Sequence, residues 1–171
     1  MNTIEDFIRD IPNFPKQGIL FKDIAPLLQN PRGVEMCLEE LLKLVGDKKI
    51  DKVVGIESRG FFFATLLAQK LNAGFIPVRK PGKLPYKTIR YEYELEYGSD
   101  ILEIHIDAIK PGQRVVIADD LIATGGTLKS TIKLIEQLGG EVVGICTLIE
   151  LTYLEGRKKL DGYNVFSLIK Y

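Results

Sequence analysis

Two adjacent carboxylates, Asp119 and Asp120, and the small residues after them are the part of the chain best suited to chemistry. They follow the apolar residues 115–118, which predict a buried strand, and precede a short glycine-containing loop, 123–127. Apolar side chains then recur at helical spacing over 128–138. A strand, a loop and a helix start bring backbone N–H groups and the positive end of a helix dipole together. The pattern therefore predicts an anion site.

The composition of this loop and the acidic pair before it indicate which anion would bind. Its two glycines let the backbone approach an anion closely, and its two threonines add hydroxyl donors. The aspartates would repel a phosphate, so we expect them to face another part of the same ligand. Ionised carboxylates only accept hydrogen bonds, and the vicinal hydroxyls of a ribose can donate two. The pattern favours a ribose 5-phosphate group. An ordinary turn with two solvated aspartates explains either half of it, but explains both halves together poorly.

Other phosphate-binding motifs fit the sequence less well. A G-x-x-x-x-G-K-[ST] loop is missing, because Lys129 and Ser130 lie inside the expected helix with no glycine directly before them. No G-x-G-x-x-G follows an expected strand, so a dinucleotide site has no support.

A second strand–loop–helix pattern occurs earlier in the chain. Residues 52–56 predict a buried strand and residues 61–71 predict a helix, with Glu57, Ser58 and Arg59 between them. Arg59 and the backbone amides near Ser58 would suit a polyanion at the helix start. In open α/β sheets ligands collect at the carboxyl ends of the strands. The alternative is a surface ion pair between Glu57 and Arg59 without any ligand.

Residues 79–100 predict a mobile basic segment. Arg79, Lys80 and Lys83 directly follow an expected strand, 73–78, and alternate with prolines and a glycine. The alternation that follows, through residue 99, suggests an arm of two short antiparallel strands. Because long excursions in compact domains are usually functional, we interpret 79–100 as a flexible lid over the substrate. A solvated edge hairpin, with lysines that discourage aggregation, is the alternative.

The N-terminal region combines a helical pattern with a proline-containing stretch. Apolar residues at helical spacing over 4–11 predict a short amphipathic helix, whereas the prolines and glycine of 11–24 predict an extended loop. That loop carries several apolar side chains, among them Leu20 and Phe21, which are costly to expose. They either pack on their own core or form a flat pocket for an aromatic base. A helix is expected over 33–45.

The remaining segments, the composition and the net charge limit the class of protein. Further strands are expected over 101–107, 142–148 and 164–169; His105 is expected in mid-strand without a catalytic role. With 46% hydrophobic and 27% charged residues, the 171-residue chain suits one soluble domain. Lys plus Arg and Asp plus Glu number 23 each, so no basic excess predicts nucleic-acid or membrane binding. Two cysteines in apolar surroundings and the lack of a signal peptide predict a cytoplasmic protein.

Four segments, in order, resemble one enzyme family. Residues 116–127, Val-Ile-Ala-Asp-Asp-Leu-Ile-Ala-Thr-Gly-Gly-Thr, resemble the phosphoribosyl pyrophosphate (PRPP) motif of the type I phosphoribosyltransferases. Residues 14–24, 79–85 and 95–98 are similar to segments of the members that act on adenine. The resemblance implies a doubly wound α/β domain over 1–171, with a mainly parallel sheet flanked by helices, an N-terminal hood (residues 1–30) and the lid. It implies transfer of the 5-phosphoribosyl group of PRPP to adenine, giving AMP and pyrophosphate.

The resemblance also assigns roles to individual residues. It implies that the ribose 5-phosphate group is bound by Asp119, Asp120, Ala123, Thr124, Gly125, Gly126 and Thr127. It implies that pyrophosphate is bound by Ser58, Arg59, Arg79, Lys80 and Lys83. It implies that adenine is bound by Leu20, Phe21, Lys22 and Leu151, although Lys22 stands where many relatives have arginine.

The same resemblance suggests the catalytic groups, the cofactor and the assembly. Arg59 and Glu96, the latter beside Tyr97 in the lid, would be catalytic, with Glu92 and Glu94 as alternatives to Glu96. Mg²⁺ would be carried mainly by PRPP, with no protein residue assigned as its ligand. A homodimer is expected, with Arg79 reaching across the interface.

Two other functions remain compatible with the sequence. A transferase for another base, such as hypoxanthine, would share the PRPP loops and differ only in the hood. A regulator that senses PRPP without catalysis would normally carry an added DNA-binding module, for which the 171 residues leave no obvious room.

Overall fold

The computed structural model describes residues 3–94 and 99–171, which form two compact units, 1–40 and 41–171. Among these residues, no helix combines the length and apolar character that a membrane span requires. Each unit has its own strands and helices.

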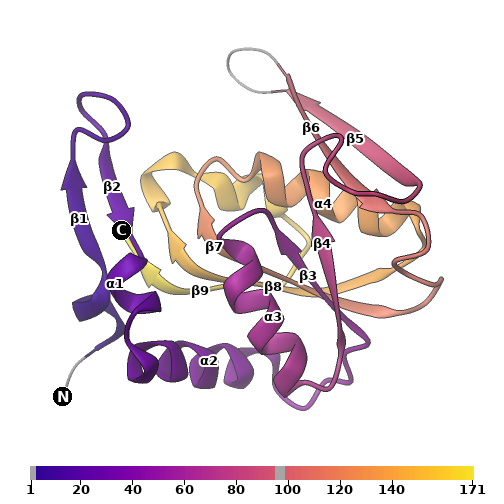
Figure 1. The fold of residues 1–171 in the computed structure, drawn as a ribbon, viewed down its shortest axis with the longest axis horizontal. Coiled ribbons are helices and arrows are strands. Elements are labelled where there is room, and N and C mark those ends of the chain that lie inside the picture. The colour runs from indigo at the N-terminus through magenta and orange to yellow at the C-terminus, as the bar shows by residue number, and fades with distance from the viewer. Residues whose placement is uncertain (1–2, 95–98) are drawn as a thin grey trace. The chain divides into compact units, whose positions relative to one another are not determined.

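A five-stranded parallel sheet forms the centre of the larger unit, in the order β4-β3-β7-β8-β9 (Figure 1). Its strands are β3 (Lys52–Ile56), β4 (Gly74–Val78), β7 (Arg114–Ile122), β8 (Glu141–Glu150) and β9 (Val165–Lys170). The chain winds in one direction from β3 to β4 and in the other from β7 to β9. This reversal confirms the predicted doubly wound α/β class.

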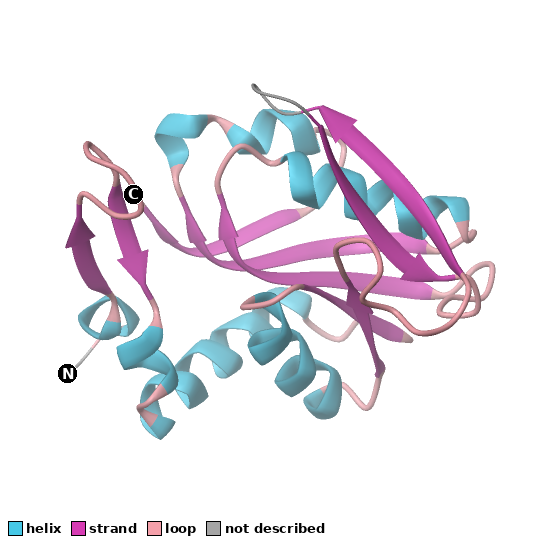
Figure 2. Ribbon diagram, turned by 45° about the horizontal axis from the view of Figure 1, so that its top comes forward, coloured by secondary structure: helices cyan, strands magenta, loops and turns pink. Residues whose placement is uncertain are grey.

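Helices α3 (Gly60–Lys70) and α4 (Gly126–Gln137) cover opposite faces of this sheet, as Figure 2 shows. Both sheet faces are therefore buried, which explains why the strands are apolar runs and not alternating patterns. Ile117 of β7, Ile132 of α4 and Ile145 of β8 are completely buried in one core. Each such side chain contributes about 1.5–3 kcal/mol through burial of apolar surface. Two short 3-10 helices, η2 (Thr152–Leu154) and η3 (Gly156–Leu160), join β8 to β9.

An antiparallel hairpin of β5 (Thr88–Glu94) and β6 (Ser99–His105) lies alongside α4 (Figure 1). The prediction of two short strands within 91–99 was wrong in its limits, because the partner of β5 is the segment that we expected to be a separate strand. Ile89, Tyr91 and Tyr93 pack against the core while the residues between them are exposed. The base of the arm is thus anchored by apolar packing and is not a solvated edge.

The smaller unit contains a hairpin of β1 (Arg9–Pro12) and β2 (Leu20–Asp23), preceded by the 3-10 helix η1 (Ile4–Phe7). It continues into α1 (Ala25–Leu28) and α2 (Pro31–Val45), and α2 runs past the boundary of the unit. The predicted helix over 4–11 was wrong beyond η1, and the expected extended loop is largely the β1–β2 hairpin. Backbone pairing of β1 with β2 outweighed the helical spacing here. An ion pair of 2.6 Å between Arg9 and Asp23 lies at the end of this ladder.

Candidate active site

The site lies where three neighbouring strands end. Strands β4, β3 and β7 are adjacent and parallel, so the loops that follow them meet at the same edge of the sheet. A cavity of about 410 Å³ opens there, lined by residues 56–59, 119–125, 127 and 128. The structure therefore brings together the two anion loops that the sequence analysis predicted separately.

The acidic pair lies inside β7, which continues past it to Ile122 and does not end before it as we expected. Asp120 forms an ion pair with Arg59, with 2.7 Å between Asp120 Oδ2 and Arg59 Nε, and only 9% of the Asp120 side chain is exposed. The carboxylate of Glu57 instead accepts hydrogen bonds from Arg79, Lys83 and the backbone N–H of Lys80. Asp119 lies against the start of α3, where a Cβ on Gly60 would approach its Oδ1 to 2.5 Å. The close approach of β7 to α3 explains why position 60 is a glycine.

Burial dominates the electrostatics of this pair. It raises the pKa of Asp119 well above the usual value, and the adjacent charge of Asp120 raises it further. Burial also raises the pKa of Asp120, although the positive charge of Arg59 opposes the shift. Two carboxylates in this position need hydrogen-bond donors or a cation, since an unpaired buried charge is costly. The cavity beside them has room for a ligand that supplies donors.

The loop 123–127, predicted to bind a phosphate and called the phosphate loop below, turns at Gly125, whose φ of +76° favours glycine, and α4 begins directly after it. The 12-residue helix directs the positive end of its dipole toward the loop. Thr124 is exposed in the cavity wall, and the Oγ1 of Thr127 lies 3.3 Å from the hydroxyl of Tyr93. Ala123 also lines the cavity.

Gly156, for which the sequence predicted no role, packs its backbone against this loop. A Cβ on Gly156 would lie 2.1 Å from the carbonyl oxygen of Ala123, and one on Gly125 would lie 2.2 Å from the carbonyl oxygen of Gly156. The two backbones therefore touch with no space for a side chain. Arg157 holds the segment by donating to both carboxylate oxygens of Glu150, at 2.9 and 2.5 Å. A lone glycine between charged residues carried no signal of this contact.

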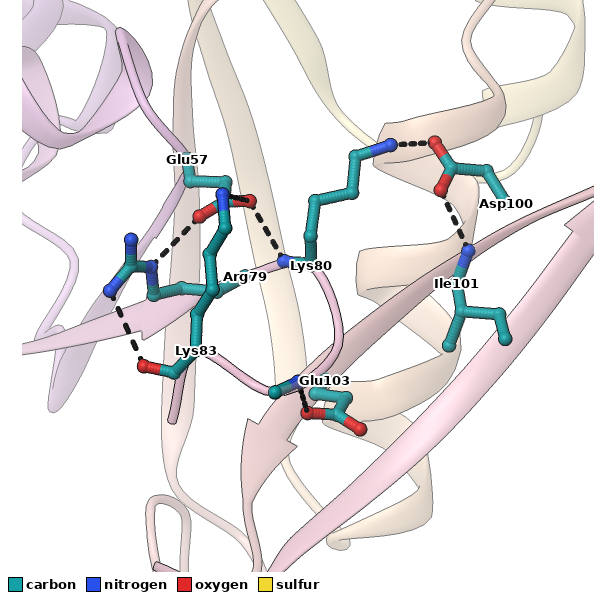
Figure 3. Close-up of polar contacts among 8 residues, drawn as sticks. Glu57, Arg79, Lys80, Lys83, Asp100, Ile101 and Glu103 are labelled. Carbon is teal, nitrogen blue, oxygen red and sulfur yellow. Dashed lines mark hydrogen bonds and ion pairs between the residues drawn. The ribbon is translucent and has the colours of Figure 1, made fainter. Parts of the chain in front are cut away.

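The basic segment folds around Glu57, as Figure 3 shows. The carboxylate of Glu57 accepts hydrogen bonds from Arg79 Nε at 2.8 Å, Lys83 Nζ at 2.9 Å and the backbone N–H of Lys80 at 3.0 Å. Burial acts to raise the pKa of Glu57, but these three donors outweigh it and the pKa lies below the usual value. Glu57 is a second residue whose role was missed, because its donors come from more than 20 positions further along the chain.

Other residues with expected roles are less fully placed. Ser58 lines the cavity, and the peptide bond between Glu57 and Ser58 is cis. Leu151 follows β8 and donates its N–H to the carbonyl of Ile122 at 2.9 Å, so it lies at the same edge of the sheet. Glu96 and Tyr97 lie outside the described residues, and their roles stay predictions.

The three expected base-binding residues of the hood all belong to β2 of the smaller unit. The ring of Phe21 makes an edge-to-face contact with Phe14 at 5.1 Å, and Leu20 is 45% exposed. Lys22 forms an ion pair of 2.7 Å with Asp10. Part of the apolar set thus packs within its own hairpin, and a base pocket shared with Leu151 stays a prediction.

The cavity offers few carboxylate oxygens that could bind a metal ion. Within 3–94 and 99–171, no three His, Cys, Asp or Glu side chains form a group that could hold a metal. Mg²⁺ prefers six oxygen ligands, so Asp119 and Asp120 could supply only part of its coordination shell.

Comparison with known proteins defines the class. The model of the phosphoribosyl transferase domain matches residues 24–170, and the chain belongs to this family. The chain is 60% identical to the adenine phosphoribosyltransferase of Acetivibrio thermocellus over 165 residues, 96% of either protein. It is 61% identical to that of Flavobacterium johnsoniae over 168 residues, covering 98% of this chain and 99% of the relative.

Solved structures agree in fold. The adenine phosphoribosyltransferase of Thermoanaerobacter pseudethanolicus superimposes with a TM-score of 0.95 at 56% identity, over 99% of this chain and 100% of that one. The Saccharomyces cerevisiae enzyme, solved with adenine and an imino-altritol bisphosphate, gives a TM-score of 0.91 at 43% identity, over 96% of each chain.

Proposed function

We propose that the protein transfers the 5-phosphoribosyl group of PRPP to adenine, releasing AMP and pyrophosphate, in purine salvage. The observation that carries the proposal is the cavity between the Asp119–Asp120 pair, the phosphate loop and Arg59. The similarity of nearly the whole chain to adenine phosphoribosyltransferases supports the choice of base.

In this proposal the ribose 5-phosphate group lies across the end of β7. The backbone amides of 124–127 and the start of α4 bind the phosphate, and the ribose hydroxyls donate to Asp119 and Asp120. The ribose hydroxyls would replace the Arg59 guanidinium as hydrogen-bond donors to Asp120. Because Asp120 then keeps a partner, moving the guanidinium toward the pyrophosphate costs less free energy. Arg59 thus exchanges one anion for another as the substrate binds.

The chemistry needs positioning and charge stabilisation more than it needs a nucleophile. The anomeric carbon loses pyrophosphate and becomes oxocarbenium-like, as in glycoside hydrolysis. Holding the ribose at both its phosphate and its hydroxyls aligns that carbon with the base. Arg59, Lys80, Lys83 and the amide of Ser58 stabilise the negative charge that develops on pyrophosphate. Mg²⁺ would be carried mainly by PRPP and would neutralise the same charge, and Asp119 and Asp120 are the cavity carboxylates that could help to hold it.

In this proposal the base is recognised by the hood residues and by Leu151, the roles that the family resemblance implies. Phe21 stacks on the purine, Leu20 meets its polar edge through the backbone, and Lys22 is held back by Asp10. Glu96 exchanges a proton with the purine. Closure of the lid, which includes Tyr97, keeps water from the oxocarbenium-like anomeric carbon. A 6-amino group donates a hydrogen bond where a 6-oxo group accepts one, so the hood discriminates adenine from hypoxanthine.

The decisive experiment is product analysis. The protein is mixed with Mg²⁺, PRPP and equal amounts of adenine and hypoxanthine, and the nucleotides are separated by chromatography. Formation of AMP with pyrophosphate supports the proposal, and formation of IMP supports a transferase for the other base. If no nucleotide forms, transferase activity is refuted.

We further propose a cytoplasmic homodimer. Both cysteines are buried and unpaired, and burial raises the pKa of each thiol to about 12, which suits small core residues in a reducing compartment. Phe62 and Leu66, one turn apart on α3, are 48% and 39% exposed and offer an apolar contact for a second copy. Light scattering of the purified protein tests the dimer.

A further inference from the structure

Asp100, at the start of β6, holds one of the cations expected to bind pyrophosphate. Its Oδ2 forms an ion pair with Lys80 Nζ and accepts a hydrogen bond from the hydroxyl of Tyr93 at 3.2 Å (Figure 3 shows the Lys80 pair). Its Oδ1 accepts the backbone N–H of Ile101 at 2.9 Å. The Asp100 side chain is 23% exposed and that of Lys80 is 45% exposed. The ion pair is therefore accessible to a competing anion.

Tyr93 connects this ion pair to the phosphate loop. Its hydroxyl lies 3.3 Å from Thr127 Oγ1, and its ring lies 3.4 Å from the position of a Cβ on Gly126. An ionised carboxylate can only accept, so the single proton of Tyr93 goes to Asp100 and Thr127 donates to Tyr93. When Thr127 turns its proton to a bound phosphate, Tyr93 can keep donating to Asp100. Asp100 then retains two donors even if Lys80 leaves.

We propose that Asp100 is a positioning residue that competes with pyrophosphate for Lys80, and that Tyr93 stabilises the carboxylate once Lys80 has moved. The inference rests on the proposed function, in which Lys80 binds the pyrophosphate group of PRPP. Freeing Lys80 leaves a part-buried carboxylate with fewer partners, and that cost is subtracted from the affinity for pyrophosphate. The same competition favours release of pyrophosphate after transfer.

The two residues have opposite expected effects on pyrophosphate affinity. In Asp100→Asn the neutral amide no longer holds Lys80, so pyrophosphate binds more tightly. In Tyr93→Phe the carboxylate loses a donor and depends more on Lys80, so pyrophosphate binds more weakly. Because Tyr93 acts through the charge of Asp100, the double variant behaves like Asp100→Asn alone. A residue that merely holds the hairpin together would lower affinity when replaced, and would not raise it.

Isothermal titration calorimetry with pyrophosphate in excess Mg²⁺ tests this. We expect the dissociation constant to fall roughly two- to fivefold in Asp100→Asn and to rise by a similar factor in Tyr93→Phe, the range of a partly exposed ion pair. The gain in Asp100→Asn shrinks as salt is added. Asp107→Asn removes the same charge from an exposed position in the turn after β6 and leaves the constant unchanged. Ribose 5-phosphate, which probes the phosphate loop, binds wild type and Asp100→Asn equally.

The outcomes separate this inference from the proposed function. If wild type binds neither pyrophosphate nor ribose 5-phosphate, the proposed function fails and the inference falls with it. If wild type binds both, but Asp100→Asn leaves pyrophosphate affinity unchanged or lowers it, only the role of Asp100 is overturned. An equal gain in Asp107→Asn would also overturn it, because the effect would then be one of net charge.

Discussion

Replacing Gly156 by alanine should damage PRPP binding from a position with no side chain of its own. The new Cβ would lie 2.1 Å from the carbonyl oxygen of Ala123 and 2.8 Å from the amide nitrogen of Gly125, whereas real Cβ contacts are essentially never below 3.0 Å. The backbones must therefore separate by about 0.9 Å at Ala123. Neither neighbour is a flexible side chain, so the phosphate loop itself has to move.

A shift of this size acts on both stability and activity. Overpacking of a well-packed contact costs about 1–3 kcal/mol of unfolding free energy. A misplacement of about 1 Å in a positioning element lowers catalysis by roughly two orders of magnitude. We expect the KM for PRPP to rise by at least about tenfold, with a much smaller change in the KM for adenine, because the displaced amides face the 5′-phosphate.

Steady-state kinetics with each substrate varied in turn, together with thermal unfolding, provide the assay. Gly144→Ala is the matched control, since a Cβ at that position of β8 would meet its nearest neighbour at 3.9 Å. If Gly156→Ala and Gly144→Ala show the same KM for PRPP, Gly156 does not support the phosphate loop.

Three further predictions concern charged side chains of the site. Lys83→Met should raise the KM for PRPP by about tenfold with only a small fall in melting temperature, because Glu57 keeps its donors Arg79 and the amide of Lys80. Unchanged kinetics would remove Lys83 from the site. Glu57→Gln should lower the unfolding free energy at pH 7 by about 1 kcal/mol. Because the folded-state pKa of Glu57 is depressed, this deficit is present above the unfolded pKa of about 4.3 and vanishes as pH falls through the folded pKa. A deficit in urea titrations that does not shrink as pH falls below the unfolded pKa would contradict the ionic explanation. Asp119→Asn should melt higher than wild type at pH 8 and equally near pH 3, since a raised pKa means that the ionised form destabilises the fold. The same variant should lose at least about tenfold in kcat/KM for PRPP, and full activity would refute a ribose contact.

The order of elements in the larger unit was readable from local pattern. Residues 52–56 and 115–118 are apolar runs too short for helices, and they form adjacent buried strands of the sheet. Spacing over 128–138 predicted α4, which ends at Gln137. These predictions succeeded because burial on both sheet faces and on one helix face leaves a periodic trace in the sequence.

Predictions failed where long-range backbone pairing decided the structure. The helical spacing of 4–11 was outweighed by the β1–β2 ladder, which joins residues up to 14 positions apart. The partner of β5 was placed wrongly because alternation identifies a strand without identifying its neighbour.

The amino-acid sequence alone determined the chemical character of this protein. An acidic pair and a glycine turn follow one apolar run, a cluster of cations follows another, and such runs predict a parallel sheet. Only the tertiary structure decided how those groups pair. Arg59 meets Asp120, Glu57 collects three donors of the basic segment, and Gly156 lies against the phosphate loop. The physical reason is that hydrophobic patterning acts over neighbouring residues, whereas ion pairs and backbone contacts join segments that only the folded sheet brings to one edge.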